Sequence, residues 1–355
     1  MINVKSINEY SKSPLDSISN AYQTKPNSFL EPGIKILAGT RGSGKSFTAS
    51  KIMLQAVKDK TFDVIYMITP TYESNLGHWK QFNINAENVF YPSREAIRNV
   101  IEAIERDRDE FENYLVEMEI YKRFKRDSKN KSTISMISAD NLNDYIEYGY
   151  VNDNGMMNRN ITKPEWKYDI IRPPQSLLVV DDCLGSSALS QTEDFTKLMI
   201  MNRHIAPLSE AYGDRQSLGC SVMLLVQTYS ARNGIPRSCR ENATDLILFT
   251  NKSKDQMKKI NDELAGAIDE EQFFIAYNYA LKDKHDNLSI TFNPHCPTKM
   301  FRRNLNEFII FPDAAKECKC GKGRKKKVMV KELKEEEKKD EKEVKEKPQN
   351  SKSNK

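Results

Sequence analysis

The sequence lacks the features that hold secreted and membrane proteins together. No apolar run approaches the roughly 18 residues of a membrane-spanning helix, and the first residues have no hydrophobic core of a secretory signal. We therefore expect a soluble, intracellular protein with no membrane partner. Cysteine is sparse, and reduced thiols are the favoured interpretation of all six: Cys183, Cys220, Cys239, Cys296, Cys318 and Cys320. The alternative is a zinc site with the ligands His295, Cys296, Cys318 and Cys320, but their spacing does not match that of a zinc knuckle.

Most of the chain carries almost no net charge. The net charge is +5, but residues 313–355 alone carry 16 Lys and Arg against 10 Asp and Glu, so residues 1–312 sum to −1. The composition gives no reason to expect a generally basic, DNA-binding body, and any such surface must be local. The Lys/Glu-rich segment 313–355 is predicted to be a disordered tail, because it cannot bury enough apolar surface to offset the entropy of ordering.

Apolar runs that end in polar or turn residues recur along the rest of the chain and predict buried strands. These strands are expected at 34–38, 63–69, 89–91, 177–180, 219–226 and 246–249, with an edge strand at 288–292. A helix is expected from Lys45 to about Val57. A long amphipathic helix should run from a cap at Ser93 to about Arg126, and packing on the domain edge is favoured over a coiled-coil partner site. Alternating strands and helices predict an α/β fold with a mostly parallel central sheet flanked by helices.

A glycine-rich segment lies between the first of these strands and the first helix. It has the spacing G-x-x-x-x-G-K-S and consists of Gly39, Thr40, Arg41, Gly42, Ser43, Gly44, Lys45 and Ser46. Such a loop lets backbone N–H groups converge on phosphates without obstruction by Cβ atoms, and the helix N-terminus adds partial positive charge. Lys45 is expected to reach the β- and γ-phosphates, and the Ser46 hydroxyl to ligate Mg²⁺. The alternative, a turn without a ligand, leaves Lys45 unexplained.

Two aspartates follow the apolar strand at 177–180. A P-loop enzyme needs one carboxylate for the magnesium shell and a second group to activate water, and ligands of open α/β sheets bind at the carboxyl ends of the strands. We therefore assign Asp181 to Mg²⁺ and Asp182 to orienting or deprotonating the attacking water. Taken alone, an apolar run ending in Asp would be an ordinary solvated strand end; the P-loop upstream makes the catalytic interpretation the better one.

Gln227 ends the strand at 219–226, where an amide can sense the γ-phosphate or position water. The alternative is a strand-end amide bound to backbone. Arg203, Arg237 and Arg240 are candidates for a positive group that stabilises the transition state, supplied by a neighbouring subunit of a ring. Arginines are more often solvated or paired with carboxylates, and Arg203 is the preferred candidate among the three.

The order of these motifs resembles that of viral genome-packaging ATPases of the FtsK–HerA superfamily, of the type found in poxviruses, other large DNA viruses and virophages. The resemblance covers about residues 30–312. Its P-loop and acidic pair are generic, and the stretch from Gln227 to Asn242 is the more specific part. Two features depart from the pattern. Many members carry Asp-Glu in place of Asp181 and Asp182, and the segment 207–217 lengthens the connection after Arg203.

Residues 1–30 are polar and are expected to form an N-terminal arm before a P-loop ATPase domain at 31–312. Within that domain we expect a helical and irregular insertion at about 93–170, because the long charged helix is followed by a polar, Asn-rich stretch. The resemblance implies a homo-oligomeric ring that uses ATP and Mg²⁺ to move double-stranded DNA into a preformed capsid. Capsid proteins would be partners, and the location would be the virion or the viral assembly site. The alternatives are a cellular-type DNA translocase of the same superfamily, a nucleotide-gated assembly scaffold and, less favoured, a P-loop kinase.

Overall fold

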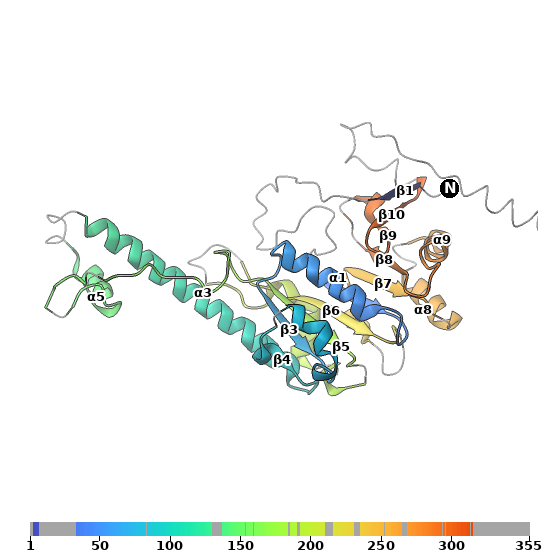
Figure 1. Ribbon diagram of the computed structural model, residues 1–355, viewed down its shortest axis with the longest axis horizontal. Helices are drawn as coiled ribbons and strands as arrows, with labels where there is room; N and C mark the ends of the chain where they lie inside the picture. Colours follow the sequence, from blue (N-terminus) through green and yellow to red (C-terminus); the bar gives the residue numbers. More distant parts are fainter. Residues whose placement is uncertain are drawn as a thin grey trace, which may run out of the picture.

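The protein folds around one twisted sheet of ten strands. The computed structural model describes residues 3–6 and 33–314, apart from 83, 130–136, 153, 159, 184, 190–191, 210–215, 231–234, 252, 265–267, 293, 295 and 313. The strand order is β1-β10-β9-β8-β7-β2-β6-β5-β3-β4 (Figure 1). The predicted tail and most of the predicted N-terminal arm lie outside the described residues.

Six strands form the parallel half of the sheet. Their order is β7 (Asp245–Phe249), β2 (Ile34–Ala38), β6 (Ser221–Val226), β5 (Ser176–Asp181), β3 (Val64–Ile68) and β4 (Val89–Phe90). Four of them, namely β2, β5, β6 and β7, are buried along their whole length, which is typical of parallel strands covered on both faces. All six correspond to predicted strands, and the fold class is confirmed.

Four antiparallel strands extend the sheet beyond β7. They are β8 (Asn287–Thr291), β9 (Phe301–Arg303), β10 (Glu307–Ile310) and β1 (Asn3–Ser6). The expectation that 288–292 forms an edge strand is wrong, because β8 pairs with β7 on one side and β9 on the other. Strands β9 and β10 are joined by a tight turn with positive φ at Asn304 and Leu305.

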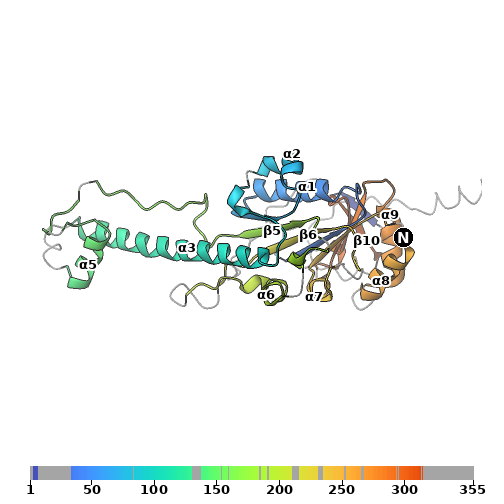
Figure 2. The ribbon, with the colours of Figure 1, turned by 90° about the horizontal axis from the view of Figure 1, so that it is seen from below.

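Helices cover both faces of the sheet. Helices α1 (Lys45–Lys58) and α2 (Leu76–Trp79) lie on one face (Figure 2). The opposite face holds α3 (Ala96–Asp127), α6 (Glu193–Met201), α7 (Arg237–Glu241), α8 (Lys254–Leu264) and α9 (Glu270–Ala280). Strand residues alternate between the two cores: Ile36 of β2 packs toward α3 and α6, and Leu37 packs toward α1. The described part contains no helix long and apolar enough to span a membrane.

Helix α3 projects from the domain as an arm (Figure 1). Its residues as far as Met118 join the main core, whereas Ile120 and Phe124 near its end form a separate aromatic cluster with Tyr145 of α5 (Ala139–Glu147). The long predicted helix is confirmed, and its last turns pack against α5. Ser93 provides no side-chain cap: the helix begins after Glu95 without one. The segment expected as an insertion, 93–170, contains α5 in addition to α3.

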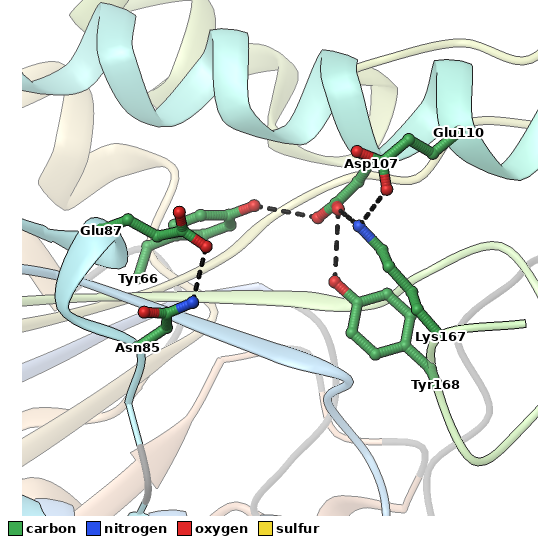
Figure 3. Close-up of polar contacts among 7 residues, drawn as sticks. All are labelled: Tyr66, Asn85, Glu87, Asp107, Glu110, Lys167 and Tyr168. Carbon is green, nitrogen blue, oxygen red and sulfur yellow. Dashed lines mark hydrogen bonds and ion pairs between the residues drawn. The ribbon is translucent and has the colours of Figure 1, made fainter.

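A buried carboxylate ties the base of this arm to the sheet (Figure 3). Asp107 of α3 accepts hydrogen bonds from the hydroxyls of Tyr66 on β3, at 2.9 Å, and Tyr168, at 3.2 Å. Lys167 pairs with both Asp107 and Glu110, each at 2.5 Å. Burial raises the pKa of both tyrosines, and the neighbouring Asp107 charge adds to the effect, so they remain protonated donors.

The cysteines follow the expectation only in part. Cys183, Cys220 and Cys239 are buried free thiols, and burial raises the pKa of each to about 12. Cys296 is disulfide-bonded, so the expectation of a reduced thiol is wrong there. Cys318 lies outside the described residues, as do His295 and Cys320, which the zinc alternative would need. Within the described ranges, no group of three or more His, Cys, Asp or Glu side chains could hold a metal ion.

Candidate nucleotide-binding site

The P-loop, the aspartate pair and Gln227 meet at one edge of the sheet. Strand β6 lies between β2 and β5, and all three run parallel. Ala38 at the end of β2 pairs with Val226, and Asp181 at the end of β5 pairs with Leu225. The backbone N–H of Gly39 donates to the Val226 carbonyl at 3.1 Å, so the loop begins directly beside Gln227. Three strand ends thus assemble residues that are up to 188 positions apart in the sequence.

Glycine is required at specific points of the loop. A Cβ on Gly39 would lie 2.6 Å from the Phe249 Cβ and 2.7 Å from the Ser43 hydroxyl oxygen, closer than real Cβ atoms approach. Gly42 and Gly44 have φ of 75° and 104°, which side-chain-bearing residues rarely adopt. Gly44 then precedes α1 without a side-chain cap, so the first N–H groups of the helix keep no capping partner from that residue.

Lys45 is the first residue of α1, and its side chain folds back over the loop. Its ammonium donates to the carbonyls of Gly39 at 2.8 Å and Thr40 at 3.0 Å. Burial lowers the pKa of Lys45, while the negative charges of Asp181 and Asp182 act in the opposite direction. The charges of both carboxylates therefore act on the Lys45 ammonium.

The two aspartates have different environments. Asp181 is buried, and burial, reinforced by the adjacent Asp182 and opposed by Lys45, raises its pKa to about 6. Asp182 is exposed and has a left-handed backbone with φ of 56°, an uncommon conformation for a residue other than glycine. The Gln227 amide donates to a carboxylate oxygen of Asp182 at 2.8 Å. Gln227 therefore bonds to the neighbouring carboxylate, whereas the alternative expectation was a bond to the backbone.

These groups fit a magnesium ion brought in with phosphates. Ser46 is partly buried in the first turn of α1, and the Asp181 carboxylate carries a charge that its surroundings leave poorly compensated. Mg²⁺ in nucleotide sites takes one or two protein oxygens and completes its shell with phosphates and water, so a two-residue donor set suffices. In the same loop the buried Ser43 hydroxyl oxygen has no hydrogen-bond partner in the described structure.

The three candidate arginines lie in different surroundings. Arg240 pairs with Glu263 and stacks over Tyr229 at 5.4 Å, and Arg237 pairs with Glu241 at 2.6 Å. Arg203 is exposed, and its guanidinium has no hydrogen bond or ion pair within the described ranges.

The position of Arg203 excludes a role at the P-loop of its own chain. The preceding residue, Asn202, bonds through its carbonyl to the N–H of Cys220 at 2.7 Å, just before β6 begins. Gln227 follows the other end of that strand, roughly 20 Å away at about 3.3 Å per residue. Arg203 can serve a nucleotide site only in a neighbouring subunit.

His285 is a residue that the sequence analysis did not single out. It lies in the turn between α9 and β8, and its Nδ1 is 3.6 Å from the position that a Cβ on Gly44 would take. Antiparallel pairing of β8 with β7 returns the chain to the P-loop edge and places this turn there. Because 288–292 was expected at an edge of the sheet, the sequence offered no signal that the preceding turn adjoins the loop.

Solved structures with a similar fold include two of the genome packaging NTPase B204 from Sulfolobus turreted icosahedral virus 2. The sulfate complex is 13% identical, with 77% of this chain and 95% of that chain covered and a TM-score of 0.41. The ATP-gammaS complex is 12% identical, with 79% and 97% covered and a TM-score of 0.41. The cytoplasmic domain of the type VII secretion ATPase EccC from Thermomonospora curvata is 14% identical, with 79% and 25% covered and a TM-score of 0.34.

Structures of a viral genome packaging NTPase are thus among those to which this chain is similar. No family model and no curated protein sequence matches the chain. The site assignment therefore depends on the geometry of the three strand ends.

Replacing Asp181 should stabilise the metal-free protein. Its pKa is raised from an ordinary 3.8 to about 6, so above pH 6 the buried charge opposes folding, and below about pH 4 the carboxyl is neutral in both states. We expect Asp181→Asn to raise the free energy of unfolding by about 1–3 kcal/mol at pH 7.5, with a gain that shrinks as the pH falls through 6 toward 4. Urea unfolding at several pH values measures this. A variant no more stable than the unchanged protein at pH 7.5 would contradict the burial argument.

Proposed function

We propose that this protein is an ATP hydrolase that drives double-stranded DNA into a preformed viral capsid. The observation that carries the enzymatic part is the meeting of the P-loop, Asp181, Asp182 and Gln227 at one sheet edge, with β6 between β2 and β5. The DNA-packaging part is supported by the order of motifs and by the fold shared with B204, which is itself described as a DNA-packaging ATPase.

The P-loop side of the site binds the triphosphate. The N–H groups of the loop and of the first turn of α1 face the phosphates, and Lys45 exchanges its two carbonyl partners for β- and γ-phosphate oxygens. A magnesium ion held by Ser46 and Asp181 would supply positive charge against the charge that develops on the phosphate oxygens. The negative charge of Asp181 destabilises the protein without a ligand, and the magnesium ion would compensate it in the complex.

The opposite side of the site activates water. Asp182 projects from an exposed strand end, and the hydrogen bond from Gln227 occupies one of its oxygens. A γ-phosphate oxygen competes for the Gln227 amide, which releases Asp182 to orient and deprotonate the attacking water. Gln227 thus binds the γ-phosphate while it is present. After the phosphate leaves, the amide bonds to Asp182 again, and this changes the contacts at the end of β6.

A neighbouring subunit completes the site in this proposal. Arg203 lies at the far edge of the sheet, beside Ile200 and Met201, whose side chains are 54% and 46% exposed. Exposed apolar residues around an unpaired arginine are suited to a subunit interface. The interface would be head to tail, because Arg203 and the P-loop lie at opposite edges of the same sheet, and such contacts close into rings.

Double-stranded DNA should stimulate ATP hydrolysis. Coupling of phosphate loss to translocation requires a rate that rises several-fold when DNA is added. The measurement is steady-state phosphate release by the full chain with and without linear duplex DNA, with Lys45→Ala as the inactive control. Hydrolysis that ignores DNA would contradict the motor and favour the nucleotide-gated scaffold.

Lys45 and Asp182 should affect different steps. Lys45→Ala should abolish ATP binding and turnover, because the phosphates lose their cation. Asp182→Asn should lower kcat by about 100-fold or more while ATP still binds, because only the base is lost. Calorimetric titration of ATP and phosphate-release rates separate the two effects. Asp140→Asn, an exposed aspartate on α5, is the matched control and should change neither. Equal loss of ATP binding in both site variants would refute the division of roles.

Arg203 should act across subunits. Arg203→Ala and Lys45→Ala should each be inactive alone. The first lacks the arginine supplied to the neighbouring site, and the second lacks the lysine that binds the phosphates. Mixed before assembly, they place an intact Arg203 beside an intact P-loop at about a quarter of the interfaces of a ring. We expect phosphate release to recover in the mixture. Arg237→Ala should retain full activity, and a mixture as inactive as its components would contradict the trans role.

A further inference from the structure

Two turns from the antiparallel half of the sheet reach the edge that carries the P-loop. Phe249 at the end of β7 pairs with Asn287 at the start of β8, so the α9–β8 turn lies at this edge. Leu288 pairs with Arg303 at the end of β9, which brings the β9–β10 turn to the same edge. Both turns lie on the β7 side of the P-loop, opposite the β6 and β5 strand ends.

His285 is the residue of these turns that approaches the P-loop. Its Nδ1 and Cβ lie 3.6 and 3.7 Å from the Cβ position built on Gly44, one residue before Lys45. The imidazole is exposed, and it forms no hydrogen bond or ion pair within the described ranges. An imidazole without a hydrogen-bond partner in the described part of the chain, beside a loop suited to phosphates, is available to a bound nucleotide.

A hydrogen-bond network fixes the turn that carries His285. The Asp286 carboxylate accepts from Arg303 at 2.8 Å, from the Asn304 amide at 2.6 Å and from the N–H of Asp283 at 3.0 Å. The Asn304 side-chain carbonyl in turn accepts from the N–H of Asn287 at 2.9 Å. These bonds join the two turns to each other, and the pKa of Asp286 is lowered by its bonds to Arg303 and Asn304 despite the opposing effect of burial.

The order of strands determines which end of a nucleotide would meet His285. The γ-phosphate must lie beside Asp181, Asp182 and Gln227, at the ends of β5 and β6. In the proposed site the phosphates would follow the P-loop away from these groups, so the nucleoside would extend toward the other side of β2. That side is occupied by β7, β8 and the turn with His285.

We propose that His285 contacts the nucleoside of bound ATP, with its imidazole stacked on the purine, and that Asp286 is a positioning residue for it. This inference rests on the proposed ATP site and adds a specificity element to it. Loss of the stacking of a base on a flat side chain should weaken affinity by about tenfold. Phosphate recognition by Lys45 and the loop does not depend on it.

The test compares ATP with inorganic tripolyphosphate, which presents the same phosphates without a nucleoside. Calorimetric titration with Mg²⁺ should show that His285→Ala weakens ATP binding by about tenfold and leaves tripolyphosphate binding unchanged. His285→Phe, which keeps a flat ring, should retain most of the ATP affinity. Asp286→Asn should weaken ATP in the same selective way but by less. Asp140→Asn, an exposed aspartate on α5, is the control and should change neither affinity.

Three results would overturn the inference: unchanged ATP affinity in His285→Ala, equal losses for ATP and tripolyphosphate, or a Phe variant as weak as the Ala variant. Each of them leaves the proposed ATPase intact, because the unchanged protein still binds ATP. Failure of the unchanged protein to bind ATP would instead refute the proposed function, and the His285 inference with it.

Discussion

The alignment of three parallel strand ends is the constraint on which the candidate site depends. The N–H of Gly39 donates to the carbonyl of Val226 at 3.1 Å, which fixes the start of the P-loop against the end of β6. Because β6 separates β2 from β5, Gln227 lies between the phosphate loop and the aspartates. Under the proposed function, a nucleotide bound there would contact all three strand ends, and loss of its γ-phosphate would change the contacts of β6.

The site concentrates charge at a cost to the protein alone. The pKa of Asp181 is raised to about 6, the pKa of Lys45 is lowered, and burial is the main cause in both cases. Groups arranged in this way are destabilised until a partner of the right charge arrives, which is typical of functional sites. The hydrogen bond from Tyr66 to Asp107, by contrast, joins α3 to β3 and serves the fold.

Local patterns predicted the parallel strands, the P-loop helix and the long α3 helix. Apolar runs and helical spacing involve residues that are close together in the sequence, so both can be recognised without the fold. The β9–β10 hairpin and the pairing of β1 with β10 were missed, because short strands of mixed polarity become strands only through partners far along the chain. For the same reason, the position of His285 beside Gly44 has no local signal. The hydrogen bond between Gln227 and Asp182 likewise joins strand ends 45 residues apart.

A crystal structure of the protein with Mg²⁺ and a non-hydrolysable ATP analogue tests the central claim most directly. The strand-end geometry requires the triphosphate to lie in the loop 39–46, with its terminal phosphate within hydrogen-bond distance of both Lys45 and Gln227. The metal should contact Ser46 and lie beside Asp181. A nucleotide bound elsewhere, or a terminal phosphate remote from Gln227 and the two aspartates, would contradict the account.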